Sequence, residues 1–331
     1  MGKAGKRKAD ETLDFFKVAG VSGISDSLIR TLLKRLKNDE TTEKIQGGRS
    51  IERRFPELQN FIKEHDCGLT TVDLQLYLDK LCEIKPDFLQ LWSSTVLATQ
   101  KSQGSVQAFI YVDEVVPGNI IAPDNKRRSF CYYICWKDLV RFRSDLLWFP
   151  FAMIRHDNVE KCEGELVGVF SKVLKDLQPF LFSLIVGSDM IHTTRLYFIA
   201  DEDGLKKSAS HKGASGLRPC IKCKNCISKG NSVPGYFDIS ECNWSRFELA
   251  TDAETMEMFA HLKHVCANAS KKDFEEASKL SGWKWLPQLW AEDDELWSLL
   301  KVSDFCYDNL HNYFSCGTVP MEIGSFLEAT L

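Results

Sequence analysis

AFIYVD (residues 108–113) and RLYFIAD (residues 195–201) are two apolar runs that each end in an aspartate. Runs of β-branched and aromatic residues are typical of buried strands, and an acid at the end of such a strand is held on rigid backbone. Two acids on adjacent strands can share divalent metal ions, which phosphoryl-transfer nucleases require. Asp113 and Asp201 are therefore the first candidate functional residues, and they indicate an enzyme that acts on nucleic acid.

The segments between these two runs predict an α/β core over residues 105–226. The first strand is expected to end at Asp113, and further strands are expected at 129–136 and 148–155, followed by an amphipathic helix at 164–182. Three strands, a crossover helix and a fourth strand follow the order of an RNase H-like fold, a mixed sheet with helices on its faces. In that order the first and fourth strands are neighbours, so Asp113 and Asp201 are expected to converge.

The rest of the chain is expected to form three further regions. Residues 1–12 are interpreted as a disordered basic tail, and residues 13–104 as a helical N-terminal region that caps the core, an interpretation we favour over a DNA-binding helical module. Residues 227–331 are interpreted as a helical insertion. Part of it, residues 241–300, carries 12 Asp and Glu against 6 Lys and Arg, with five interspersed tryptophans.

Composition limits the class of protein. The longest apolar stretch spans nine residues (146–154), too few to cross a membrane, and the N-terminus lacks the apolar region of a signal peptide. Twelve cysteines in such a chain favour reduced thiols and metal ligands over disulfides. We therefore expect a nuclear or cytoplasmic protein. The net charge of −4 gives no global basic field, although the basic Lys6–Lys8 tail suits a nuclear address, a DNA-contacting arm or a solvated end.

A pair of cysteines follows the second aspartate. Cys220 and Cys223 are spaced as in a zinc knuckle, and a second pair of ligands must complete a tetrahedral site. Several residues are available as partners, namely Cys226 locally and His261, His264 and Cys266 further along the chain. The alternative is that these are ordinary reduced thiols, because cysteine is often simply buried.

Several motifs in order resemble those of a transposase superfamily. DEDGLK (201–206), KGASG (212–216) and PCIKCKN (219–225) resemble the DDE/D transposases of the CACTA-like type, in particular the transposase-like proteins of protist and algal genomes. An Asp-x-x-His element follows in those families, and Asp308–His311 matches it. YVDEVVPGN (111–119) is similar to their first-acid motif, so the resemblance runs from about residue 109 to residue 331.

The resemblance implies DNA strand cleavage and strand transfer, as in the DNA recombination of mobile elements. Two Mg²⁺ (or Mn²⁺) ions would be held by Asp113 and Asp201, with Asp203 as a rival for the second position. A third acid should follow the Asp-x-x-His element, where only Glu322 and Glu328 remain. We therefore expect a truncated copy with an incomplete active site.

The resemblance also implies a structural Zn²⁺ site of Cys220, Cys223 and His311. The expected partners are the DNA ends of a mobile element and a further copy of the chain, without a membrane. Two alternatives stay open. One is a catalytically inactive or domesticated DNA-binding protein derived from a transposase, and the other is an unrelated zinc-binding interaction domain.

Overall fold

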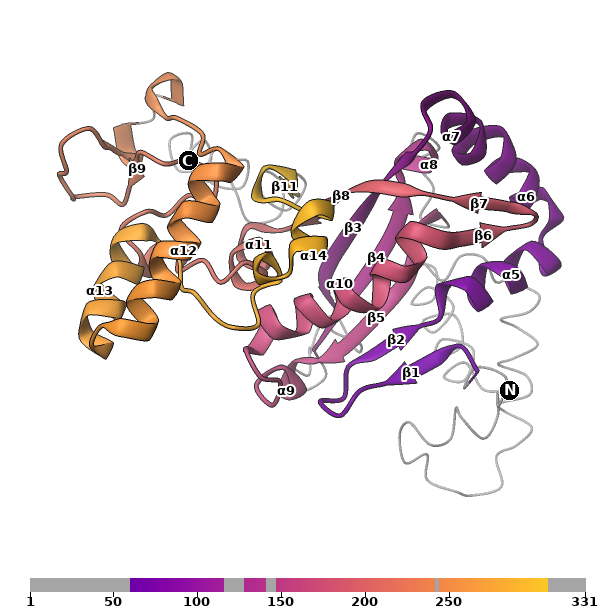
Figure 1. Ribbon diagram of the computed structural model, residues 1–331, viewed down its shortest axis with the longest axis horizontal. Coiled ribbons are helices and arrows are strands. Elements are labelled where there is room, and N and C mark those ends of the chain that lie inside the picture. The colour runs from indigo at the N-terminus through magenta and orange to yellow at the C-terminus, as the bar shows by residue number, and fades with distance from the viewer. Residues whose placement is uncertain (1–59, 116–127, 141–146, 242–243, 309–331) are drawn as a thin grey trace, which may run out of the picture.

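The computed structural model describes residues 60–115, 128–140, 147–241 and 244–308, which form an α/β protein around a mixed seven-stranded sheet (Figure 1). The order across the sheet is β1-β2-β5-β4-β3-β8-β11. These strands are β1 (Ile62–Glu64), β2 (Thr70–Val72), β3 (Val106–Val115), β4 (Ser129–Trp136), β5 (Phe149–Arg155), β8 (Thr193–Ala200) and β11 (Phe305–Tyr307).

The sheet has an antiparallel half and a parallel half. From β1 to β3 every neighbouring pair is antiparallel, whereas β8 is parallel to both β3 and β11. Parallel neighbours need a crossover connection, and helix α10 (Glu165–Ser183) lies in the segment that leads from β5 to β8. The expected adjacency of the first and fourth core strands is therefore confirmed.

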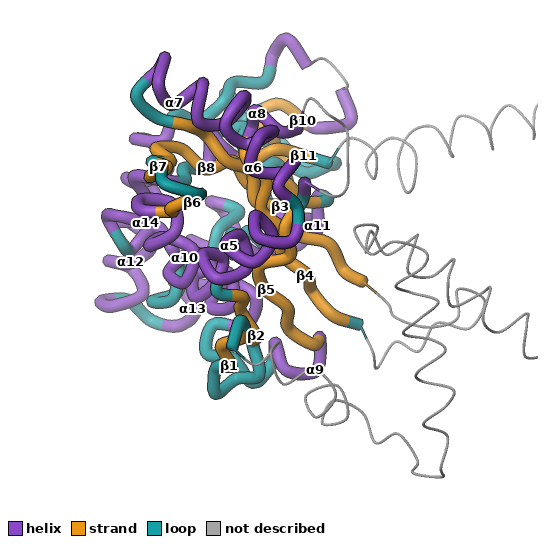
Figure 2. Tube along the Cα trace, turned by 90° about the vertical axis from the view of Figure 1, so that its right-hand side faces the viewer, coloured by secondary structure: helices purple, strands orange, loops and turns teal. Residues whose placement is uncertain are grey.

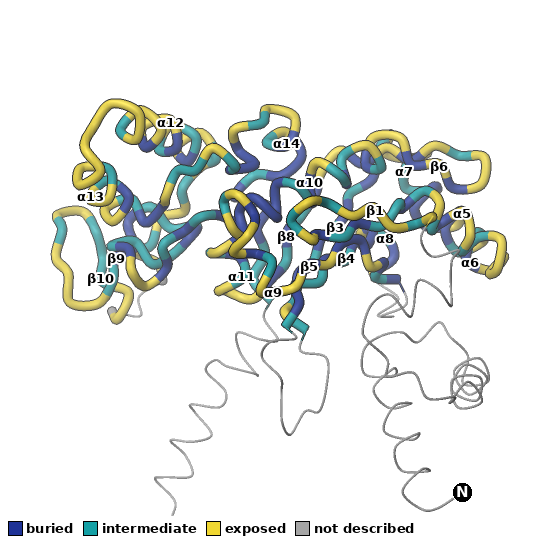
Figure 3. The backbone as a smooth tube through the Cα atoms, turned by 90° about the horizontal axis from the view of Figure 1, so that it is seen from below, coloured by how far each residue is buried: buried dark blue, intermediate teal, exposed yellow. Residues whose placement is uncertain are grey.

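One face of the sheet is buried under helices. Along β3, Ala108, Ile110 and Val112 are buried, while the alternate residues are only partly covered, as the two-residue period of a strand dictates. Helices α10 and α14 (Asp294–Leu299) lie on one side of the strands (Figures 2 and 3). Phe170 of α10 packs on Phe198 of β8, with 4.4 Å between ring centroids. The alternate residues of the strands form a second, partly covered face, where Phe109 of β3 stacks on Tyr197 of β8 with 5.2 Å between ring centroids.

The N-terminal helices pack at one end of the sheet. They are α5 (Leu74–Ile84), α6 (Pro86–Trp92) and α7 (Ala98–Gln103). Asp73 starts α5 by accepting a hydrogen bond from the Leu76 N–H at 3.0 Å, and a proline opens α6, where its missing N–H costs nothing. Trp92 meets Trp136 of β4 edge to face, with 4.7 Å between ring centroids.

The chain leaves the sheet after β8 and returns at β11. In between it forms α11 (Glu202–Ser208), the short pair β9 (Cys226–Ile227) and β10 (Phe237–Asp238), α12 (Asp252–Asn268), α13 (Lys271–Ser281) and α14. Capping boxes start α12 at Thr251 and α13 at Ser270. β9, α12 and α13 make a lobe beside the sheet (Figure 1). The remaining α-helices and strands are α8 (Lys137–Val140), α9 (His156–Val159), β6 (Leu184–Val186) and β7 (Asp189–Ile191).

The central strands and helix that the sequence predicts are present, whereas the short strands were not predicted. The strand at 129–136 is confirmed, and those at 148–155 and 195–200 and the helix at 164–182 differ from the structure by one or two residues. The expectation that the first strand ends at Asp113 is wrong, because Glu114 and Val115 still pair with β4. The segment predicted to be helical up to residue 104 contributes β1 and β2 to the sheet, and the predicted insertion contributes β11. Throughout the described residues, each helix is too short or too polar to cross a membrane.

Candidate functional site

The first two candidate aspartates lie near the carboxyl ends of two parallel neighbours: Asp113 is two residues before the end of β3, and Asp201 directly follows β8. Tyr111 of β3 pairs with Ile199 of β8. Asp113 comes two residues after Tyr111 in β3, and Asp201 comes two residues after Ile199, just beyond the end of β8. The negative charges of both aspartates act on Tyr111, so the two lie on the same side of this strand pair. Neighbouring strands lie about 4.8 Å apart, so the structure brings together the two acids that the sequence singled out.

A third aspartate, Asp308, lies on the other side of β8. Asp113, Asp201 and Asp308 thus form a row of three aspartates across the strands. Tyr307 of β11 pairs with Ala200, and the next N–H, that of Asp308, donates to the Ala200 carbonyl at 2.8 Å. Asp308 therefore stands beside Asp201, as Asp113 does on the opposite side. In the sequence, Asp308 is recognisable only as part of the Asp-x-x-His element. Its place beside Asp201 could not be predicted, because the strand before it has three residues and shows no alternation of apolar and polar residues.

Tyr111 lies near all three carboxylates and is hydrogen-bonded to one of them. Its hydroxyl donates a hydrogen bond to Asp308 Oδ2 at 3.2 Å, reaching across β8 from β3 to β11. Burial raises the pKa of Tyr111, and the negative charges of Asp113, Asp308 and Asp201 raise it further. The phenol therefore keeps its proton at neutral pH and acts as a donor that orients the third carboxylate.

Asp201 is fixed by the helix that follows it. Its Oδ1 accepts a hydrogen bond from the Gly204 N–H at 2.6 Å and caps α11. A Cβ on Gly204 would lie 2.8 Å from that oxygen, so a glycine leaves room for the cap. Asp203 is exposed and pairs with Lys207 on the surface of α11 at 2.6 Å, which favours Asp201 over Asp203 as the residue in the row.

The structure also limits how many of these side chains could bind one metal ion. Among the described residues, no group of three or more His, Cys, Asp and Glu side chains is close enough to hold a metal ion. Mg²⁺ keeps several waters and takes one or two carboxylates plus substrate phosphates. A site of this kind would therefore need only one or two carboxylates of the row, with waters and a substrate phosphate as the other ligands. Glu322 and Glu328, the expected third acids, lie outside the described residues.

The cysteine pair forms a second cluster. The Cys223 N–H donates to Cys220 Sγ at 3.3 Å, and the Cys223 thiol interacts with the ionised Cys220 sulfur strongly enough to shift the pKa of both groups. This interaction lowers the pKa of Cys220 to about 6 and raises the pKa of Cys223. Burial and the charge of Cys220 raise the pKa of Cys226 to about 11. Cys220 thus has the thiolate character of a zinc ligand.

Tyr307 connects the thiols to the row of aspartates. Burial raises the pKa of Tyr307, and the charge of the nearby Cys220 raises it further; the next residue along the chain is Asp308. The Cys-x-x-Cys segment therefore lies close to the strand that carries the third carboxylate. His311, the ligand implied by the resemblance, comes four residues after Tyr307 but lies outside the described residues. His261, His264 and Cys266, the alternatives, are exposed on α12.

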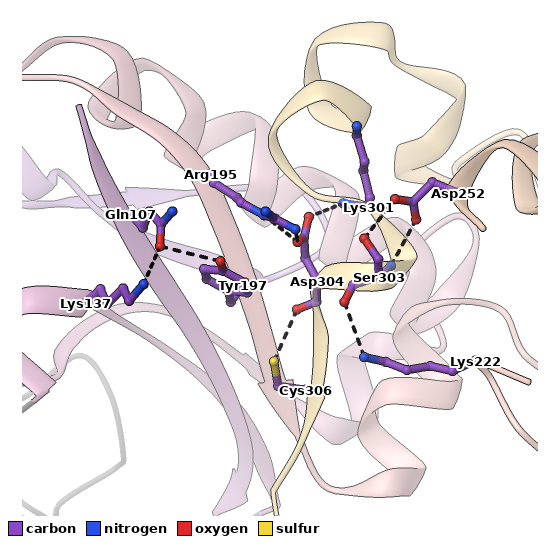
Figure 4. A network of polar contacts seen from close by, with 10 residues as sticks. All are labelled: Gln107, Lys137, Arg195, Tyr197, Lys222, Asp252, Lys301, Ser303, Asp304 and Cys306. Atoms are coloured by element: carbon purple, nitrogen blue, oxygen red, sulfur yellow. Dashed lines mark hydrogen bonds and ion pairs between the residues drawn. The ribbon is translucent and has the colours of Figure 1, made fainter. Parts of the chain in front are cut away.

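A polar network ties β11 and the lobe to the sheet (Figure 4). Its central contact joins Arg195 of β8 to the buried Asp304, with Nε donating to Oδ1 at 2.7 Å. Ser303 contacts Asp252 of α12 through its hydroxyl at 2.8 Å, and Lys222, between the two cysteines, donates to the Ser303 carbonyl at 3.3 Å. This network sets the position from which Asp308 reaches the row.

Replacing Arg195 with alanine is expected to lower the free energy of unfolding by about 2 kcal/mol, because the buried Asp304 carboxylate loses its charged donor. Urea denaturation followed by circular dichroism measures the change. Lys80→Ala is the control, since Lys80 and Glu83 form an exposed pair on α5 whose loss is expected to cost less than about 0.5 kcal/mol. Equal losses in the two variants would contradict the assigned role of Arg195.

No protein-family model and no curated protein matches this chain.

Proposed function

We propose that this protein is a DDE/D-type polynucleotidyl transferase with an RNase H-like core, related to the CACTA-like transposases. The observation that carries the proposal is the row of Asp113, Asp201 and Asp308 near the carboxyl ends of three adjacent parallel strands. A single aspartate at a strand end is usually a turn former. Three in one register, drawn from segments far apart in the chain, are better explained by a common role in metal binding, in which adjacent pairs would each hold an ion.

The order of the strands supports the RNase H-like assignment. Strands β3, β4 and β5 form an antiparallel meander, α10 crosses over, and β8 then pairs with β3 on its free side. β11 adds a second parallel neighbour after the long excursion through the lobe. Asp113 lies two residues before the carboxyl end of the first strand of that order, and Asp201 directly follows the fourth, close to the positions that the resemblance implies.

The residues of the row have defined roles in this proposal. Asp113, Asp201 and Asp308 would hold Mg²⁺ or Mn²⁺, which when bound polarises the scissile phosphate and lowers the pKa of an attacking water or 3′-hydroxyl. Tyr111 orients Asp308 by its hydrogen bond. The Gly204 N–H holds one oxygen of Asp201 and leaves the other oxygen for a ligand.

Cys220 and Cys223 would form part of a structural zinc site. Zinc would be held by Cys220 and Cys223, and the donors that complete its usual set of four must come from residues such as His311. The proximity of Tyr307 to Cys220 favours a site that fixes the lobe to β11. The proposed substrate is the DNA end of a mobile element, and the proposed location is the nucleus.

The test is a strand-transfer assay with pre-cut DNA ends and Mn²⁺. The wild-type chain is expected to join or nick DNA, and Asp113→Ala is expected to be inactive, because it loses the carboxylate on β3. Asp203→Asn is the matched control, since Asp203 pairs with Lys207 away from the row, and it should keep the wild-type rate. If the wild type and Asp113→Ala are equally inert, catalysis by this chain is excluded.

Measuring DNA binding beside strand transfer distinguishes an active enzyme from an inactive copy. A chain that binds DNA but shows no metal-dependent strand transfer would be a DNA-binding protein derived from a transposase. Zinc binding without any DNA binding would support the interaction-domain alternative.

A further inference from the structure

The second face of the sheet, opposite α10 and α14, carries aromatic side chains that lead to the row of aspartates. Side chains two residues apart along a strand lie on the same face. On β3 this face holds Gln107, Phe109, Tyr111 and Asp113, and each of these side chains is only partly covered. The aromatic side chains therefore share their face with the first candidate aspartate.

The neighbouring strands widen this group into an aromatic strip of five rings. Phe109 stacks on Tyr197 of β8, with 5.2 Å between ring centroids. Tyr111 lies 6.3 Å from Tyr133 of β4, and it meets the ring of Trp148 edge to face at 5.9 Å. Trp148 directly precedes β5. The strip thus crosses the centre of the sheet from β8 to β5.

Solvent reaches this face of the sheet. The five rings of the strip are each partly exposed, and Met153 of β5, which pairs with Cys131 of β4, is 47% exposed. Cys131 also pairs with Asp113, so Met153 lies level with that aspartate. An exposed apolar surface of this kind is typical of a binding site, and here it borders the row.

Two cations lie at the end of the strip that is farther from the row (Figure 4). Lys137 donates to the amide oxygen of Gln107 at 2.8 Å, a neutral partner that leaves its positive charge in place. Arg195 lies opposite Gln107 on β8. Its guanidinium is 5.2 Å from the ring centroid of Tyr197, although Asp304 offsets its charge. The face therefore runs from cations, over aromatic rings, to carboxylates.

We infer that this face binds a single strand of the DNA substrate and leads it to the row. The inference rests on the proposed function for the kind of substrate, and it adds where the strand lies. Unpaired bases stack on aromatic rings whatever their sequence, whereas the bases of a duplex are not free to do so. Lys137 would contact a backbone phosphate.

The length of the face suits a short strand. Six residues along β3 separate Gln107 from Asp113, a span of about 20 Å. A stacked strand rises about 3.4 Å per nucleotide, so the face has room for about six nucleotides. One end of that strand would meet Lys137, and the other end would place a phosphate at the row.

The test is equilibrium binding of a short fluorescent oligothymidylate, measured by fluorescence anisotropy in the presence of a chelator so that no metal chemistry takes part. Trp148→Ala and Tyr197→Ala are each expected to weaken binding about tenfold, because one base loses the ring on which it stacks. Tyr197→Phe keeps the ring and should bind as the wild type does. Trp297→Ala is the matched control, since Trp297 is partly exposed on α14, at the opposite face.

The salt dependence of binding tests the cationic end. Lys137→Gln is expected to lower the slope of log affinity against log salt concentration by about one, because one phosphate contact is lost. Tyr197→Leu, which keeps apolar volume without a flat ring, replaces Tyr197→Ala if circular dichroism shows that the alanine variant is unfolded.

The failure of this inference is distinguishable from that of the proposed function. A wild-type chain that does not bind the oligonucleotide, or alanine variants that bind it equally well, would overturn the inference. Loss of self-association in Trp148→Ala, with unchanged DNA binding, would also overturn it, because a second copy of the chain would then occupy the face. Ring-dependent DNA binding without any strand transfer would support the inference and refute the proposed catalysis alone.

Discussion

Replacing Asp308 with asparagine is expected to lower the rate of metal-dependent DNA strand transfer by about 10³-fold. Asparagine still accepts the hydrogen bond that Tyr111 donates to Asp308, so the local structure should survive. The substitution removes only the negative charge. Losing one charged metal ligand is expected to cost about 4 kcal/mol of transition-state stabilisation, which corresponds to about three powers of ten in rate.

This result would identify the third acid. Single-turnover rates of Asp308→Asn and Asp203→Asn, measured at saturating Mn²⁺, give the comparison, and Asp203→Asn should match the wild type. A wild-type rate in Asp308→Asn, together with a large loss in Glu322→Gln or Glu328→Gln, would return the third position to the residues that the sequence suggested.

The second large effect is expected at the Cys-x-x-Cys segment. Cys220→Ser should lose the bound zinc and, with it, about 4 kcal/mol of stability when free zinc exceeds the dissociation constant about 1,000-fold. The loss should concentrate in the lobe and β11, because Tyr307 lies near Cys220 and Lys222 contacts Ser303. Elemental analysis measures the zinc, and thermal unfolding with and without a chelator measures the stability.

Cys266→Ser is the matched control for this substitution, since Cys266 is exposed on α12. It should keep both the zinc and the sensitivity to chelator. Equal zinc content in Cys220→Ser and the wild type would remove Cys220 from the site. A wild-type chain that binds no zinc would end the structural zinc proposal but would leave the row of aspartates untouched.

The central elements of the fold are readable in the sequence because they are long and strongly patterned. The strand at 129–136 and the helix at 164–182 each carry enough apolar residues to define a period. Strands β1, β2 and β11 have three residues each, too few to show any alternation. They form because a partner strand is already in place, which is tertiary information that the sequence pattern lacks.

The candidate site likewise has a part that the sequence predicts and a part that it does not. The neighbouring positions of Asp113 and Asp201 follow from strand order alone, since the ends of parallel neighbours meet at one edge. Asp308 could not be placed, because about 100 residues separate β8 from β11 and no local pattern shows where the chain returns. The proximity of Tyr307 to Cys220 is likewise a product of that return.

The most direct test of the account is Mn²⁺ binding by isothermal titration calorimetry in the absence of DNA. The wild-type chain is expected to bind Mn²⁺, and Asp201→Asn should weaken binding by at least about tenfold, because Asp201 stands between the other two carboxylates and is shared by both neighbouring pairs. Asp203→Asn should bind as the wild type does. Equal Mn²⁺ affinity in Asp201→Asn and the wild type would contradict the claim that adjacent carboxylates of this row bind a metal ion.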